Sequence, residues 1–444
     1  MLKPRHLICL FAALLAFQHR APAAEPIDAI AALQAAAEEG DAHAAQQLYL
    51  RYGLAGQPEQ ARIWATRYNE LLAKQAETGD VSAMLRLGAR YLNGGDYTPQ
   101  SIEQAVTWFT RAEEAGEPAA AYMLGDIFAR QGNPLMSGRS YARAYALYTE
   151  RADQDTDALY CLGYMEQNGI GTERNTASGL EKLTRAAESG SLWAMAQLFK
   201  TYQLGIGTAP DPAKAISYAR QAADIHHDGM MAYVTATAYL NGQGVSQDIA
   251  LGERYLDQAV AANIPDAIYM KANRLESSGE LAKALPLLRQ AASMQQPQAL
   301  TRLGALLLHG EPGIIEADTP TALAMLDAAA GRHGSPQAAW ELAEYYRAVG
   351  ETDLADSWYA TAAERGIPQA MARRGLLHLI PGTPVSWSPT QTYRWWRIGS
   401  AAADPTCTLY LRLFYYLFLP LLFLLVFALP LYLRRRLKGQ TIEG

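Results

Sequence analysis

The sequence predicts an all-α protein, a solenoid of about ten helix-turn-helix repeats followed by one C-terminal transmembrane helix. Two observations predict this class. An alanine-rich phrase recurs every 32 to 39 residues between residues 36 and 402, as in stacked helical repeats. An uncharged stretch of 21 residues, 413–433, comes after the last repeat and is long enough to span a hydrocarbon core of ~30 Å.

Each repeat can be aligned on an anchor, the residue that opens its first helix. The anchors are Ala44, Ala83, Ala120, Ala158, Ala194, Met231, Ala267, Ala299, Ala338 and Ala370. Five residues after the anchor most repeats carry glycine or alanine: Gly88, Gly125, Gly163, Ala236, Ala272, Gly304, Ala343 and Gly375. Glycine costs roughly 1 kcal/mol relative to alanine inside a helix. Its recurrence therefore predicts that a second helix approaches the first one closely at this position.

The apolar pattern predicts where each helix pair turns. Leucine is common four residues after the anchor and an aromatic residue eight after it, which places these positions on one helical face. A glycine-containing turn such as 168–171 then ends the first helix. Asp211 and Asp248 are placed to cap second helices. The seventh repeat departs from the pattern, because it lacks the Gly-x-Gly turn and carries Pro286 in its second helix.

The combined phrase resembles a known repeat family. It reads Ala-x3-Leu-Gly-x2-Tyr, then Gly-x-Gly, then Asp and an aromatic residue before Ala-Ala-x2-Gly, with the fullest copies at 83–112, 158–190, 194–223 and 231–262. This pattern resembles Sel-one-like repeats, a branch of the tetratricopeptide superfamily. The resemblance implies a right-handed superhelix with a concave inner surface. It also implies a scaffold or adaptor rather than an enzyme.

The two ends of the chain predict its location. Residues 1–23 resemble a secretory signal peptide, with a basic start, a short apolar run at 7–17, and Ala21 and Ala23 before a cleavage site. A buried helix is the alternative for this segment and for 413–433. The expected domains are a signal peptide at 1–23, the solenoid at 24–402, a juxtamembrane linker at 403–412, a transmembrane helix at 413–433 and a basic tail at 434–444.

The basic tail predicts a topology. By the positive-inside rule the tail is cytoplasmic and the solenoid lies across the membrane. We therefore expect a single-pass protein of the bacterial cytoplasmic (inner) membrane with a periplasmic solenoid. The alternative is the ER membrane with a luminal solenoid. The sequence has no Asn-x-Ser/Thr glycosylation site, which favours the bacterial envelope.

Charge and motifs argue against several functions. The chain has 38 basic and 44 acidic residues, and a net charge of +3 at each end (1–24 and 434–444) leaves −12 between them, which argues against a nucleic-acid partner. No CxxC pair, phosphate-binding loop or serine nucleophile motif is present. His226, His227 and Asp228 form the most metal-like cluster. On a helix the adjacent histidines would point about 100° apart, whereas in a loop they could bind one ion together, and a polar loop between repeats is favoured over a metal site. We expect no catalytic, cofactor-binding or metal-binding residue.

Aromatic residues on the first helices are the candidate partner-binding site. Two residues after the anchor stand Tyr122, Tyr160, Tyr233, Tyr269 and Trp340, and Tyr164 stands six after its anchor. The position two after the anchor is expected to face away from the second helix of its own repeat. In the tetratricopeptide superfamily the corresponding position lines the concave groove, and the resemblance implies the same here. Packing between successive first helices is the alternative, and the sequence leaves both open.

These observations predict a membrane-anchored, exported scaffold that binds a protein or peptide partner through the groove. The negative charge would favour a basic partner. Assembly of an envelope complex, for example in exopolysaccharide export, would suit such a scaffold. A carbohydrate-binding envelope protein, with a polysaccharide stacked on the aromatic row, is the alternative. A sensor or an enzyme has less support.

Overall fold

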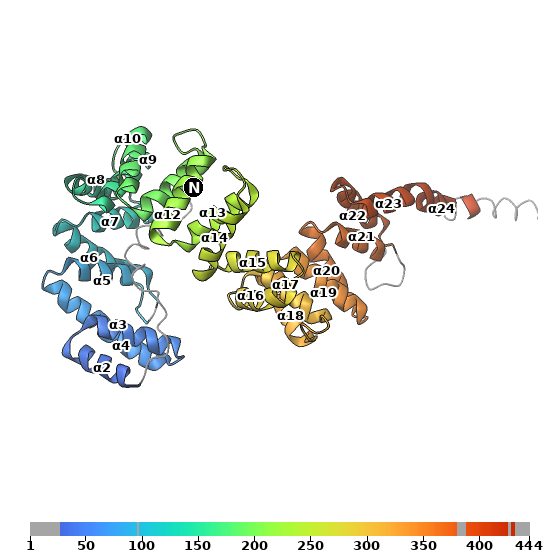
Figure 1. The fold of residues 1–444 in the computed structure, drawn as a ribbon, viewed down its shortest axis with the longest axis horizontal. Coiled ribbons are helices and arrows are strands. Elements are labelled where there is room, and N and C mark those ends of the chain that lie inside the picture. Colours follow the sequence, from blue (N-terminus) through green and yellow to red (C-terminus); the bar gives the residue numbers. More distant parts are fainter. Residues whose placement is uncertain (1–26, 96, 380–387, 425–427, 431–444) are drawn as a thin grey trace, which may run out of the picture. The chain divides into compact units, whose positions relative to one another are not determined.

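The computed structural model describes residues 27–95, 97–379, 388–424 and 428–430. The predicted signal peptide (1–23) and basic tail (434–444) lie outside these residues. The described part is helical, apart from turns and two isolated β-bridges, Gly95 with Thr98 and Glu311 with Ile315. The chain divides into two compact units, residues 1–253 and 254–444. Within each unit, helices that follow one another in sequence pack side by side (Figure 1).

Ten helix pairs are present in the described residues, and each contains one predicted anchor. After α2 (Ile27–Glu39), the pairs are α3 (Ala42–Leu54) with α4 (Pro58–Glu77), α5 (Val81–Asn93) with α6 (Ile102–Glu114), α7 (Pro118–Arg130) with α8 (Pro134–Arg151), α9 (Thr156–Asn168) with α10 (Thr176–Glu188), α11 (Leu192–Leu204) with α12 (Pro212–His226), α13 (Gly229–Asn241) with α14 (Ile249–Ala261), α15 (Pro265–Ser277) with α16 (Leu281–Ser293), α17 (Pro297–His309) with α18 (Thr319–Asp327), α19 (Pro336–Ala348) with α20 (Thr352–Glu364), and α21 (Pro368–Leu377) with α22 (Pro389–Ala401). The prediction of an all-α repeat array is confirmed.

Local signals in the sequence set the helix ends. The Asp211 carboxylate accepts a hydrogen bond from the Lys214 N–H at 3.0 Å, and the Asp248 carboxylate accepts one from the Leu251 N–H at 3.0 Å. Both bonds satisfy N–H groups that have no partner inside the helix. Gly169, after the end of α9, adopts the left-handed conformation at φ 71°, which glycine reaches without a steric penalty. The predicted aspartate caps and glycine turn are present.

Close approach of the two helices explains the recurring glycine of the first helix. A Cβ added at Gly125 would lie 2.5 Å from the Tyr141 ring, and one at Gly163 would lie 2.9 Å from the carbonyl oxygen of Gly179. The same clash recurs at Gly88 with Phe109, at Gly304 with Leu326 and at Gly375 with Trp396. In every case the contacted residue belongs to the second helix of the same repeat. The predicted close approach is confirmed.

The prediction of a transmembrane helix at 413–433 is wrong for the described residues, where no helix is both long enough and apolar enough to cross a membrane. Helix α23 (Pro405–Leu413) occupies most of the expected linker, and a π-helical turn, η2 (Phe414–Phe418), separates it from α24 (Leu419–Phe423). Residues 425–427 and 431–433 of the predicted span lie outside the described part. The predicted localisation as a single-pass membrane protein depended on this span. That prediction is therefore wrong as well.

Two features account for this error. Pro420 has no N–H and its ring crowds the preceding turn, and next to it the Leu419 N–H donates to the Phe414 carbonyl five residues back. Phe414 is only 5% exposed, and its ring lies 5.9 Å from that of Trp396 in α22. The start of the apolar stretch therefore packs on the last repeat, which hydropathy alone does not reveal.

Candidate functional site

Two of the six predicted partner-binding residues are buried. Tyr122 is 2% exposed and Tyr160 is 6% exposed. The Tyr122 ring lies 5.3 Å from the ring of Tyr141, which belongs to α8, the second helix of the same repeat. The expectation that this position faces away from its own second helix is therefore wrong for Tyr122. Neither side chain offers a surface to a partner in this conformation.

The other four predicted residues are half-buried. Tyr164 lies on α9, Tyr233 on α13, Tyr269 on α15 and Trp340 on α19. The Tyr160 and Tyr164 rings are 6.4 Å apart. The first two belong to the first unit and the last two to the second. The structure therefore shows two separate sets of partly exposed aromatic side chains on first helices.

Acidic residues six after the anchor are held by the second helix. The Tyr141 hydroxyl donates to Asp126, and the Tyr359 hydroxyl donates to Glu344 at 2.5 Å. Trp340 packs on the same Tyr359, with ring centres 5.7 Å apart. Burial acts to raise the pKa of Glu344, but hydrogen bonds from Arg347 and Tyr359 outweigh it and lower the pKa. Glu344 therefore stays charged beside the half-buried Trp340.

The most metal-like cluster of the sequence serves the fold. His226 Nε2 hydrogen-bonds the Gly190 carbonyl at 2.7 Å, and the Asp228 carboxylate accepts from the Met231 N–H at 2.8 Å. Across the described residues, no three His, Cys, Asp or Glu side chains gather as metal ligands would. Cys161 and Cys407 are buried and unpaired, and burial raises the pKa of each thiol to about 12.

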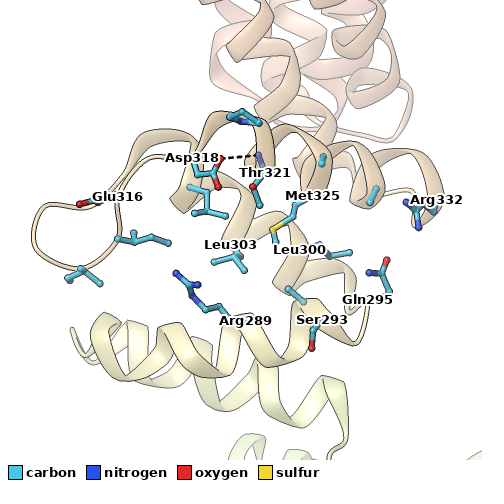
Figure 2. A pocket seen from close by; sticks show the side chains of 17 residues that line it. Arg289, Ser293, Gln295, Leu300, Leu303, Glu316, Asp318, Thr321, Met325 and Arg332 are labelled. Carbon is cyan, nitrogen blue, oxygen red and sulfur yellow. Dashed lines mark hydrogen bonds between the residues drawn. The ribbon is translucent and has the colours of Figure 1, made fainter. Parts of the chain in front are cut away.

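Sequence reasoning missed a pocket of about 950 Å³ in the second unit (Figure 2). It lies between α16, α17 and α18, and residues of the loop 310–318 line one end. Leu300, Leu303 and Leu307 of α17 contribute apolar lining. Its polar side chains come from Arg289, Ser293, Gln295, Glu316, Asp318, Thr321 and Arg332.

Three local departures from the repeat occur in the elements that form this pocket. Pro286 interrupts the hydrogen bonding of α16, the loop at 310–318 is two residues longer than the corresponding loop at 205–211, and α18 ends in a π-helical turn, η1 (Ala328–Arg332). Pro286 and the loop are visible in the sequence. The π turn is not, because its residues 328–332 read as ordinary helix.

The fold is that of a helical-repeat protein in which the helix pairs share one sequence pattern. The model of the Sel1 repeat matches residues 81–117, 118–155, 156–191, 194–227, 230–264, 297–332 and 368–404. These matches cover more than half of the chain, which therefore belongs to the Sel1 repeat family. Proteins of this family generally act as scaffolds or adaptors for protein interactions and not as enzymes.

Several known proteins are similar to this chain. An uncharacterised protein of Neisseria meningitidis is 27% identical over 276 residues, which are 61% of this chain and 54% of that protein. Chitin synthase regulatory factor 3 of Schizosaccharomyces pombe is 24% identical, over 54% of this chain and 27% of that protein. The chain thus spans between a quarter and about half of the length of these relatives.

A solved structure supports the fold. The crystal structure of a protective antigen present in uropathogenic Escherichia coli strains, described as displaying an SLR fold, is similar with a TM-score of 0.58 and 26% identity. The match covers 87% of this chain and 82% of that one.

Proposed function

We propose that this protein is a scaffold or adaptor that binds a protein or peptide partner through aromatic side chains on its first helices. The observation that carries the proposal is the half-buried state of Tyr164, Tyr233, Tyr269 and Trp340. Such side chains combine a large apolar area with a polar atom and are enriched at protein interfaces. Membership of the Sel1 repeat family supports the same class of function.

The charge of the chain favours a basic partner. Between the two basic ends the net charge is −12, and a long-range field of this kind accelerates association with positive surfaces. The finer form of the proposal places the scaffold in the assembly of an envelope complex, such as one for exopolysaccharide export. That form rests on the signal-peptide pattern of residues 1–23.

Carbohydrate binding is the second candidate. The same four half-buried aromatic rings would stack on sugar rings, and a polysaccharide would then replace the protein partner. Stacking depends little on ionic strength, whereas attraction between a charged scaffold and a basic protein is screened by salt. The two candidates therefore differ in a property that can be measured.

Site-specific photo-crosslinking in the native host tests the proposal. A photoreactive residue would replace Tyr233, Tyr269 or Trp340 in turn, and Arg220, an exposed residue on the second helix α12, would be the control position. We expect one protein to be captured from the aromatic positions and not from the control, and to bind the purified chain directly. Equal capture at Arg220, or retention of envelope polysaccharide with no protein captured, would contradict the proposal.

A further inference from the structure

We infer that the pocket between α16 and α18 binds a peptide segment of a protein partner that carries two acidic side chains with aliphatic residues between them. The inference rests on the proposed function and names the chemistry of one partner segment: the partner is basic overall, and only the segment that enters the pocket is acidic. It starts from a comparison of this junction with the other junctions between successive second helices.

At three other junctions a side chain bridges successive second helices. Arg151 donates to the Gly116 carbonyl, His226 hydrogen-bonds the Gly190 carbonyl, and Arg365 donates to the Ala330 carbonyl, each at 2.7 Å. These carbonyls lie at or just after helix C-termini, where intrahelical partners are missing. A basic side chain there also interacts favourably with the helix dipole. The side chain therefore links the C-terminal ends of two successive second helices.

The junction between α16 and η1 lacks this bridge among the described residues, as do the junctions of α4 with α6, α8 with α10 and α20 with α22. Arg332 ends η1 as Arg151 ends α8, and Gln295 stands two residues after α16 as Gly116 stands two after α6. Arg332 is exposed and makes no hydrogen bond or ion pair with any described residue. Arg332 and Gln295 both line the pocket instead. Without the bridge, the Arg332 guanidinium lies at one end of the pocket, beside its apolar lining.

A second arginine of the pocket is also uncommitted. Arg289 is exposed, has no polar partner among the described residues, and reaches from α16 toward Leu303 (Figure 2). Asp318, by contrast, accepts from the Thr321 N–H at 3.2 Å and caps α18. Glu316 is the other acid and lies on the loop, at the opposite end of the view from Arg332 (Figure 2). The pocket therefore offers two guanidinium groups to carboxylates, and an exposed carboxylate of its own, that of Glu316, lies on the loop.

The separation of these groups favours a peptide over a single-headed amphiphile. In Figure 2 Arg289 and Arg332 lie at different parts of the pocket, with Leu300 and Met325 between them. A fatty acid would pair its one carboxylate with one arginine. A peptide with two acidic side chains can reach both, and its intervening aliphatic residues can cover the leucines. Guanidinium groups bind carboxylates through paired hydrogen bonds, which adds selectivity.

Selection from a phage-displayed library of random octapeptides on the full chain tests this inference. Counter-selection would use Ala324→Trp, which places an indole in the pocket from an exposed position without changing charge. We expect the enriched peptides to carry two acidic residues separated by aliphatic ones. Their affinity should fall at least about fivefold in Arg289→Glu and in Arg332→Glu. The control Arg220→Glu makes the same charge change on α12 and should leave it unchanged.

Four outcomes would overturn the inference. The first is a failure to enrich peptides over the counter-selection, and the second is enrichment of basic peptides. The third is an affinity unchanged by Arg289→Gln and Arg332→Gln in variants shown to be folded by circular dichroism. The fourth is pocket binding of dodecanoate with no peptide binding. Photo-crosslinking from the first-helix positions then separates two failures. If these positions still capture a protein, only the pocket assignment fails. If they capture nothing, the scaffold function fails as well.

Discussion

The Arg365 guanidinium donates a 2.7 Å hydrogen bond to the carbonyl of Ala330, 35 residues earlier in the chain. Arg151 makes the same kind of bond to Gly116, also 35 residues earlier. The matching separations show that one repeat length connects equivalent positions of successive second helices. At these junctions a contact between side chain and backbone, and not only apolar packing, joins neighbouring repeats.

Arg365→Met should lower the free energy of unfolding by about 1–2 kcal/mol, because the substitution removes the donor and leaves the Ala330 carbonyl without that partner. The matched control is Arg332→Met, since Arg332 has no polar partner among the described residues. Urea unfolding of both variants measures the difference. Equal stability of the two variants would show that the bridge does not stabilise the junction.

Gly163→Ala should lower the free energy of unfolding by about 1–3 kcal/mol, because the added Cβ would lie 2.9 Å from backbone atoms of α10. Gly163→Leu should unfold the repeat around it. Gly138→Ala is the control, since that glycine lies in α8 with no atom near the added Cβ and should gain helix propensity. A Gly163→Leu protein as stable as the wild type would disprove the helix-pair packing.

Glu166 should make the first unit sensitive to acid. It is 6% exposed, and although burial acts to raise its pKa, hydrogen bonds from Ser178, Lys182 and Tyr145 lower the pKa overall. A carboxyl with a lower pKa in the folded state stabilises the protein above its unfolded pKa of about 4.3 and loses this effect as the pH falls through the folded value. The stability difference between wild type and Glu166→Gln should therefore shrink in acid. Urea midpoints at neutral pH and below about pH 4 measure it, and a constant difference would contradict the assignment.

Binding of the crosslinked partner should weaken with salt. Raising NaCl from about 0.05 M to about 0.5 M shortens the Debye length severalfold, which screens attraction between the acidic chain and a basic protein. Surface plasmon resonance on the purified pair would show the effect mainly in the association rate. Polysaccharide retention should barely respond to the same change. Salt-independent protein binding would show that charge does not select the partner.

The repeat architecture could be predicted because its signals are local and recur. The ten anchors, the close approach at Gly163 and the aspartate caps at Asp211 and Asp248 each follow from residues within one helix or turn. Repetition makes such weak signals specific. The fold class of the described part therefore follows from the sequence, apart from its C-terminal end.

The remaining features depend on contacts that periodicity does not encode. Tyr122 is buried and its ring contacts that of Tyr141 in the second helix. In the described residues the apolar end is divided into α23, η2 and α24, and Phe414 packs on the last repeat. The pocket opens where a π turn ends α18, in residues that read as regular helix. Tertiary packing decides all three.

The affinity of the crosslinked partner for Trp340→Leu tests the central claim most directly. Trp358→Leu is the matched control, because Trp358 is a half-buried tryptophan on α20, the second helix of the same repeat. If the aromatic side chains of the first helices bind the partner, Trp340→Leu should weaken binding about tenfold and Trp358→Leu should leave it unchanged. Equal loss in both folded variants, or no loss in Trp340→Leu, would contradict the claim.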